Sequence, residues 1–216
     1  MSETSTLISA EHFRYVAERT TPEDPFLADL RKAAAAEGIP QISIAPEQAS
    51  FMQILLKLGG VRQVVEIGTL AGYSAIAMAR ALPSDGRVKT IEVDPKHAEF
   101  ARRWVERSDV ANRIEVLTGK GADLLPGFPT DSADAAFLDA DKSGYPFYLK
   151  DCLRIVKKGG LIMADNAFAF GQLFDPRPTD REVPAVRAFN DVMSRTKGLH
   201  GVIVPVGDGL WVAVKK

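Results

Sequence analysis

The stretch Val64–Ser74 reads VVEIGTLAGYS, and it decides the fold that the sequence predicts. A short β-branched strand, Val61–Ile67, leads into it, and the helical pattern Ala71–Leu82 follows. The glycines at 68 and 72 permit a tight turn and a close approach of the backbone to a ligand. A strand, a glycine turn and a helix in this order indicate a nucleotide-type cleft, in which ligands bind beyond the carboxyl ends of the strands.

The alternation of strands and helices continues along the chain. Further strands are predicted at Arg87–Val93, Arg113–Thr118, Ala133–Leu138 and Gly160–Ala164, with helices at Lys96–Ser108 and Tyr145–Val156. This order is typical of a parallel sheet with helices on both faces. At the end of the chain, Gly207–Gly209 separates the strand-like runs His200–Val206 and Leu210–Lys215. A glycine-rich turn of this kind predicts a hairpin, so the last strand should run antiparallel.

The N-terminal third is predicted to be helical. Helices are expected at about Glu11–Thr20, Asp24–Glu37 and Pro46–Leu58, with Pro46 in a first turn. We expect one domain over residues 1–216. In it, residues 1–58 cap the cleft or form a dimer surface, and residues 61–216 form the Rossmann-like core. The apolar residues of Phe13–Val16 and Phe26–Leu30 favour a homodimer, although they could equally pack on the chain's own sheet.

The composition excludes several classes of protein. The chain has 216 residues, of which 46% are hydrophobic and 25% charged, so a largely disordered protein is excluded. A net charge of -1 gives no global basic field for a nucleic acid or a membrane. The polar N-terminus lacks a secretory signal, and no apolar run is long enough to span a membrane. With one cysteine, Cys152, no internal disulfide can form, and we expect a cytoplasmic protein.

Two acidic residues suggest which cofactor occupies the cleft. Glu66 stands where a dinucleotide-binding fingerprint would need a glycine, and its carboxylate suits a ligand with an amino group, such as S-adenosylmethionine. Glu92 ends the second strand and is placed to bind a ribose diol, with Asp94 as the competing candidate. Each residue alone fits a plain strand–helix turn, but the ordered set favours a cofactor site.

A second set of polar residues predicts a metal. Asp139 follows one strand, and Asp165 and Asn166 follow its expected neighbour. Their oxygens suit Mg²⁺, or else Mn²⁺ or Ca²⁺. Asp165 and Asn166 alone would read as a cap or turn. Two acidic strand ends beside a cofactor cleft favour the metal, and Lys142 nearby is placed to act as a base.

Five segments together resemble the cation-dependent class I O-methyltransferases, the caffeoyl-CoA and catechol O-methyltransferase group, in their bacterial form. They are VVEIGTLAGYSAIAMARALP, IEVDP, FLDADKSGYPFY, VKKGGLIMADN and PVGDGL. The resemblance runs from about Ile42 to the C-terminus. It implies a seven-stranded, Rossmann-like, mostly parallel sheet with an antiparallel last strand and helices on both faces.

The resemblance also implies roles for individual residues. Glu66, Gly68 and Ser74 match contacts to the methionine end of the cofactor, Glu92 the ribose acid, Gly121 and Ala122 the loop beside the adenine, and Ile42 and Ile44 backbone contacts near the cofactor. Asp139, Asp165 and Asn166 match the metal ligands and Lys142 the general base, and Asp139 is also expected to contact the cofactor and take part in catalysis. Residues 167–171 and 172–179 depart from the family pattern and flank the expected acceptor pocket.

The sequence therefore predicts a metal-dependent O-methyltransferase for a hydroxyl of a small catechol-like or phenolic acceptor. A hydroxylated tRNA nucleoside is the alternative acceptor and would use the arginines at 102, 103, 107 and 113. A nicotinamide-dependent oxidoreductase and a cofactor-binding module without activity are weaker alternatives. We expect Tyr145, Phe147 and Tyr148 to serve mainly in packing, and Cys152 to face the sheet as an inert thiol.

Overall fold

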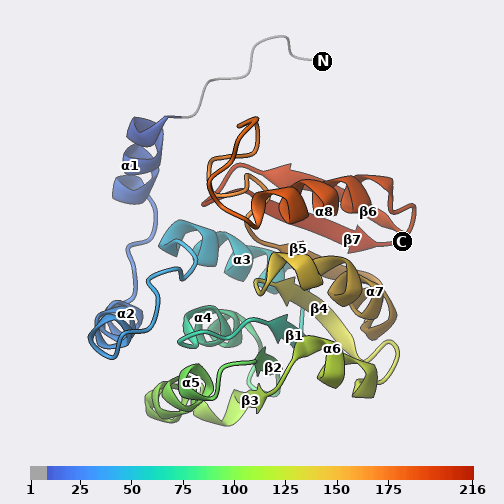
Figure 1. Ribbon diagram of the computed structural model, residues 1–216. Coiled ribbons are helices and arrows are strands. Elements are labelled where there is room, and N and C mark those ends of the chain that lie inside the picture. The colour runs from blue at the N-terminus through green and yellow to red at the C-terminus, as the bar shows by residue number, and fades with distance from the viewer. Residues whose placement is uncertain (1–8) are drawn as a thin grey trace.

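The computed structural model describes residues 9–216, and within them seven strands form one sheet in the order β3-β2-β1-β4-β5-β7-β6 (Figure 1). The strands are β1 Gln63–Ile67, β2 Arg87–Glu92, β3 Ile114–Thr118, β4 Ala133–Leu138, β5 Val156–Ala164, β6 Leu199–Val204 and β7 Leu210–Lys215. Strands β1 to β5 pair in parallel, and β7 pairs antiparallel with both β5 and β6. The predicted mostly parallel sheet with an antiparallel last strand is confirmed.

Eight α-helices accompany the strands in the described residues, and some of them begin at capping residues. They are α1 Ala10–Arg19, α2 Pro25–Ala36, α3 Pro46–Leu58, α4 Tyr73–Ala81, α5 Pro95–Arg107, α6 Gly121–Leu124, α7 Tyr145–Ile155 and α8 Val183–Arg195. Asp24 caps α2 by accepting the Leu27 amide hydrogen, and a proline occupies the first turn of both α2 and α3. Single-turn 3-10 helices follow at η1 Ala111–Arg113, η2 Leu125–Gly127 and η3 Lys142–Gly144.

Helices cover both faces of the sheet (Figure 1). On one face, α2 to α5 bury a core that includes Leu30, Met52, Ile76 and Phe100. On the other, α7 and α8 pack a second core that includes Leu149 and Phe189. Because helices bury both faces, the parallel strands are apolar along most of their length. Since helices cover both faces of the sheet, the carboxyl ends of the strands are where a ligand can bind.

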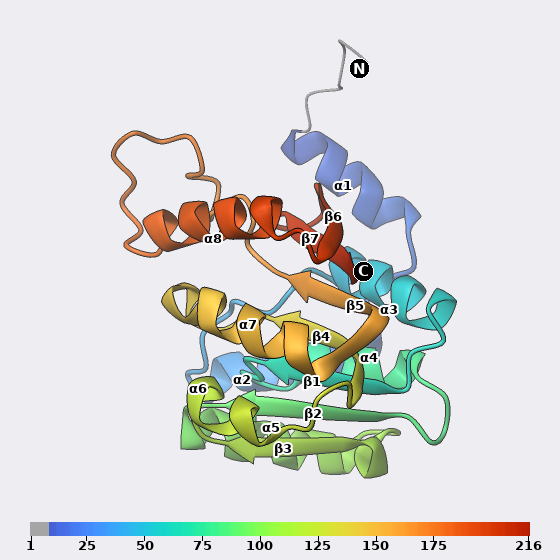
Figure 2. The same ribbon diagram turned by 90° about the vertical axis from the view of Figure 1, so that its right-hand side faces the viewer.

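Helix α8 is the element that the sequence analysis missed. Its buried residues Val183, Val186, Phe189 and Met193 have helical spacing. The preceding residues 172–182 are rich in proline and aspartate and read as a loop, which hid this pattern. Figure 2 shows the segment between β5 and α8 projecting beyond the ends of the strands. Strand β5 is also longer than expected, since it begins at Val156 and not at Gly160.

Helix α1 contributes no buried residue, and Tyr15 and Val16 on it are 60% and 39% exposed. Figure 1 shows this helix standing apart from the sheet. In residues 9–216, no helix is both long and apolar enough to cross a membrane. The expectation about a secretory signal concerns mainly residues 1–8, which lie outside the described residues.

Candidate active site

A cavity of about 780 Å³ lies at the carboxyl ends of the strands. Its walls come from the loops after β1 to β5 and from residues 42–44, which precede α3. Most predicted site residues line it: Ile42, Ile44, Gly68, Ser74, Glu92, Gly121, Ala122, Asp139, Lys142 and Asn166. Glu66 and Asp165 are not among the lining residues, and both are buried.

The glycine turn after β1 shapes the cavity. Gly68 has a φ of 101° and donates its amide hydrogen to the Ile91 carbonyl at 2.9 Å. A Cβ at this position would overlap the carbonyl oxygen of Asp139. Glycine is therefore required twice, once for the positive φ and once for the close approach of the loops after β1 and β4.

Glu66 is completely buried, and its environment fits a positively charged group. The Ser74 hydroxyl donates to one carboxyl oxygen, while among residues 9–216 nothing donates to Oε2. Burial raises the pKa of Glu66 to about 8. An unpaired buried carboxyl oxygen is costly, and an amino group bound near Ser74 would relieve that cost. The expected contact of Glu66 with the cofactor remains a prediction, since Ser74 and not Glu66 faces the cavity.

The structure separates the two candidates for the ribose acid. Glu92 is 6% exposed and lines the cavity, and its oxygens accept the amide hydrogens of Leu70 at 2.7 Å and Asp94 at 3.0 Å. Asp94 instead caps α5 by accepting the amide hydrogens of Lys96 and His97. Of the two acids, Glu92 lines the cavity and Asp94 does not, so Glu92 remains the candidate for the ribose acid.

Two carboxylates meet where β4 and β5 end. The amide of Asp139 donates to Ile67 O at 2.8 Å, and that of Asp165 donates to Leu138 O at 3.0 Å, so the parallel ladder brings these residues together. Burial and the nearby charge of Asp139 raise the pKa of Asp165 to about 7. A divalent cation would offset this repulsion, so the donor set fits one. In residues 9–216 there is no cluster of three or more acidic, histidine or cysteine side chains suited to a metal. The expected set has two carboxylates and the Asn166 amide.

Lys142 is 5% exposed and is held by two oxygens. Its Nζ lies 3.1 Å from Asp139 Oδ1 and donates to the Tyr145 hydroxyl at 2.7 Å. The Tyr145 hydroxyl donates in turn to Leu138 O at 3.0 Å. Burial, with the charge of Asp139, raises the pKa of Tyr145 well above its ordinary value, so this phenol is neutral.

The aromatic residues near Lys142 do more than the sequence analysis assigned to them. Tyr145 is buried but also binds Lys142, and Tyr148 lines the cavity and donates to Asp141 at 2.6 Å. The packing role expected for Phe147 is wrong, because this residue is 68% exposed. Cys152 is fully buried as expected, and burial raises its pKa to about 12.

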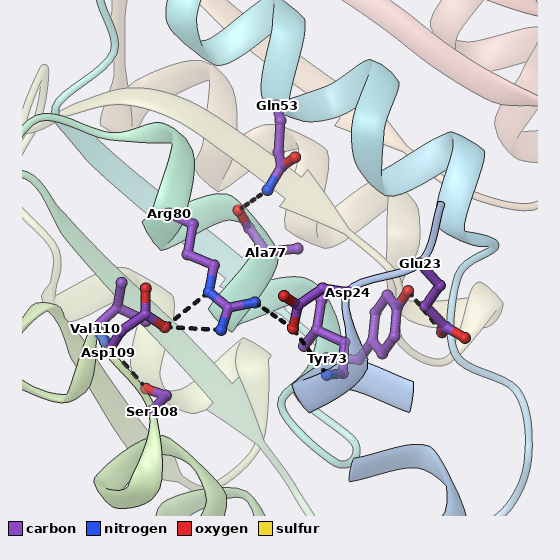
Figure 3. A network of polar contacts seen from close by, with 10 residues as sticks. Glu23, Asp24, Gln53, Tyr73, Ala77, Arg80, Ser108, Asp109 and Val110 are labelled. Carbon is purple, nitrogen blue, oxygen red and sulfur yellow. Dashed lines mark hydrogen bonds and ion pairs between the residues drawn. The ribbon is translucent and has the colours of Figure 1, made fainter. Parts of the chain in front are cut away.

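The chain before α2 is fastened to α4 beside the cavity (Figure 3). Tyr73, which lines the cavity, donates its hydroxyl to Glu23 at 3.0 Å. Arg80 donates to Asp24 at 2.9 Å and to Asp109 at 2.8 Å. Residues 42–44, which follow α2, line the same cavity as Tyr73.

A family model described as O-methyltransferase matches residues 17–216. The chain is 37% identical to a catechol O-methyltransferase of Niastella koreensis, over 96% of this chain and 97% of the relative. It is 35% identical to a catechol O-methyltransferase of Mycobacterium tuberculosis, over 84% of this chain and 82% of the relative. The chain belongs to this O-methyltransferase family.

Solved structures agree. An O-methyltransferase from Bacillus cereus in complex with SAH has a TM-score of 0.85 and 34% identity, over 94% of this chain and 96% of that one. The O-methyltransferase TomG from Streptomyces achromogenes, in complex with SAM, has a TM-score of 0.84 and 29% identity, over 94% and 95% of the two chains. The predicted family, fold and S-adenosylmethionine-dependent methyl transfer are confirmed. The oxidoreductase and the inactive binding module are therefore set aside.

Proposed function

We propose that this O-methyltransferase methylates a hydroxyl of a small catechol-like or phenolic acceptor and that it uses a divalent cation, Mg²⁺ in the first place or else Mn²⁺ or Ca²⁺. The observation that carries the proposal is the convergence of Glu92, Asp139 and Lys142 on one cavity, with the buried Asp165 near enough to Asp139 to feel its charge. The names of the two catechol O-methyltransferase relatives support the class of acceptor.

In this proposal, the cofactor lies along the loops after β1, β2 and β3. Glu92 binds the ribose hydroxyls, and Ser74, backed by Glu66, binds the methionine end. Gly68, Ile42 and Ile44 provide backbone contacts, with Gly121 and Ala122 beside the adenine. A Cβ at Gly121 would meet Tyr148 at 2.9 Å and Ile67 at 3.0 Å, so a side chain here would displace residues that line the cavity.

Asp139, Asp165 and Asn166 would hold the cation. When bound, S-adenosylmethionine supplies the methyl group and the cation supplies Lewis-acid polarisation of the acceptor hydroxyl. Asp139, which lines the cavity, would contact the cofactor as well as the cation. We assign removal of the acceptor proton to Nζ of Lys142, which Tyr145 and Asp139 hold at the cavity wall.

A small acceptor is favoured over a tRNA because two of the arginines that a nucleic acid would use already have partners. Arg103 pairs with Glu37 at 2.7 Å, and Arg102 donates to Val116 O at 2.9 Å and to Thr118. The acceptor would enter beside Phe170, which lines the cavity and is 39% exposed.

Chelation tests the cation. We expect EDTA to abolish methylation of a catechol and added Mg²⁺ to restore it. Asp165→Ala should remove activity while the affinity for SAH, measured by calorimetry, persists. Activity that survives both treatments would show that no cation is used. A parallel assay with total tRNA and labelled cofactor tests the acceptor, since transfer to tRNA but not to catechols would overturn the small-molecule assignment.

We also propose that residues 1–216 form one domain and that the protein is a homodimer in the cytoplasm. The exposed Tyr15 and Val16 of α1 support a dimer, and the single cysteine supports a reducing compartment. A purely monomeric sedimentation profile at micromolar concentration would refute the dimer.

A further inference from the structure

The turn between β6 and β7 contacts the segment that carries Asn166. Asp208 Oδ2 accepts hydrogen bonds from Asn166 Nδ2 at 3.2 Å and from the Phe170 amide at 2.8 Å. Its backbone oxygen accepts the Phe168 amide hydrogen at 2.8 Å. Asn166 and Phe170 both have positive φ values, of 64° and 58°, which a free loop would rarely keep. The turn thus holds the segment after β5 in a conformation that this segment would not hold alone.

The contact with Asp208 decides which end of the Asn166 amide faces the cavity. An ionised carboxylate can only accept hydrogen bonds, so it binds the NH₂ end of the amide. The carbonyl oxygen of Asn166 is thereby left for the cavity, which Asn166 lines. Only that oxygen can bind a cation.

A second buried amide acts on Asp165 in a similar way. Gln48, on α3, is 1% exposed, and its Nε2 donates to Asp165 Oδ1 at 2.7 Å. This bond engages Oδ1 of Asp165, whereas Oδ2 accepts no hydrogen bond from Gln48. Gly207 makes room for Gln48, because a Cβ at 207 would overlap Gln48 Oε1. The turn that carries Asp208 therefore also borders the side chain that orients Asp165.

We propose that Gln48 and Asp208 are positioning residues for the cation site, which orient Asp165 and Asn166 respectively. The inference rests on the proposed function, because the two oriented side chains are the expected cation ligands. It assigns a role to α3 and to the last hairpin of the chain. Partners of metal ligands in general affect metal affinity by about 10- to 100-fold.

Mn²⁺ is the probe for the test, because free and bound Mn²⁺ differ in their paramagnetic resonance spectra. Gln48→Met and Asp208→Ala should each weaken Mn²⁺ binding by about 10- to 100-fold. Their affinity for SAH, measured by calorimetry, should stay that of the wild type. Asp208→Asn keeps a carbonyl acceptor for Asn166 and should lose less Mn²⁺ affinity than Asp208→Ala. Weaker Mn²⁺ binding at unchanged SAH affinity and unchanged unfolding midpoint is the result that a merely structural role of the turn does not predict.

Gln53→Met is the matched control. Gln53 lies on the same helix and donates a bond of the same length, 2.7 Å, but to the Ala77 carbonyl, away from the cation site (Figure 3). This variant should bind Mn²⁺ as the wild type does. Unfolding curves for all variants identify any that fails to fold, in which case Asp208→Asn carries the test.

The outcomes separate the inference from the function on which it rests. If the wild type binds Mn²⁺ and Gln48→Met and Asp208→Ala bind it equally well, the positioning roles are overturned and the cation site stands. If Gln53→Met weakens Mn²⁺ binding as much as Gln48→Met does, the effect is structural and the inference fails. If the wild type binds no Mn²⁺ and EDTA leaves its activity intact, the proposed cation fails and the inference fails with it.

Discussion

Lys142 Nζ donates a 2.7 Å hydrogen bond to the hydroxyl of Tyr145, which is itself 1% exposed. The Tyr145 proton is directed to Leu138 O, so an oxygen lone pair faces the lysine. The neutral phenol therefore fixes where Nζ of Lys142 lies at the cavity wall.

This arrangement predicts a graded loss of activity. Lys142→Met should lower turnover by about 10²- to 10⁴-fold, as expected for loss of a general base, with SAH affinity retained. Tyr145→Phe should lower turnover less, because the lysine remains but is free to move. It should also cost about 1 kcal/mol of stability, because the buried hydrogen bond from the Tyr145 hydroxyl to Leu138 O is lost, while Leu138 O keeps the Asp165 amide hydrogen. Initial rates at saturating cofactor measure the loss of turnover, and urea unfolding measures the loss of stability. Full turnover in Tyr145→Phe would contradict the positioning role.

Gly68 is predicted to tolerate no side chain. Gly68→Ala should destabilise the fold by about 1–3 kcal/mol through the positive φ alone. The overlap with the Asp139 carbonyl should move the loop after β4 and abolish SAH binding. Gly127→Ala is the control, because a Cβ there has no atom within 4 Å and should change neither quantity. Calorimetry with SAH and thermal unfolding report the two effects, and tight SAH binding by Gly68→Ala would disprove the close approach.

Glu66 predicts a pH dependence of stability in the protein without ligand. Burial raises its pKa to about 8 in the folded state from an ordinary value of 4.5. The folded state then binds the extra proton, so the stability from this group is present below pH 4.5 and is lost as the pH rises through 8. The slope is at most about 1.4 kcal/mol per pH unit. Glu66→Gln should flatten the curve of unfolding free energy against pH, and an unchanged slope would contradict this account.

Arg80 is predicted to hold the N-terminal segment in place. Its side chain is 20% exposed, and its partners Asp24 and Asp109 are 43% and 61% exposed. Because solvent screens these pairs, Arg80→Met should cost only about 1 kcal/mol. It should nevertheless speed proteolytic cleavage near α2, because local unfolding of this segment is easier without the contact between Arg80 and Asp24. Arg195→Met, which removes an exposed pair with Asp191, should leave the cleavage rate unchanged. Equal rates for the two variants would argue against the anchor.

Much of the fold follows from local sequence. The apolar strands, the glycine turn at 68–72, the helix that begins at Pro46 and the Gly207–Gly209 hairpin are all readable from residue type and spacing, because backbone conformation depends on near neighbours. The position of Asp139 at the cavity was also predictable, since the carboxyl ends of parallel strands share one edge of the sheet. Helix α8 was missed because a proline-rich loop precedes its apolar stripe.

The tertiary structure decided which side chains meet. Gln48 and Asp165 are 117 positions apart, and Asn166 and Asp208 are 42 apart, so no local pattern could pair them. The choice of Glu92 over Asp94, and the burial of Glu66 behind Ser74, likewise depend on how loops pack around the cavity. The sequence by itself determined the glycine turn, the sheet and the residues at the strand ends, because these depend on backbone geometry. Only the packing of distant segments decided the orientation of each side chain, because hydrogen-bond partners are set by position in space.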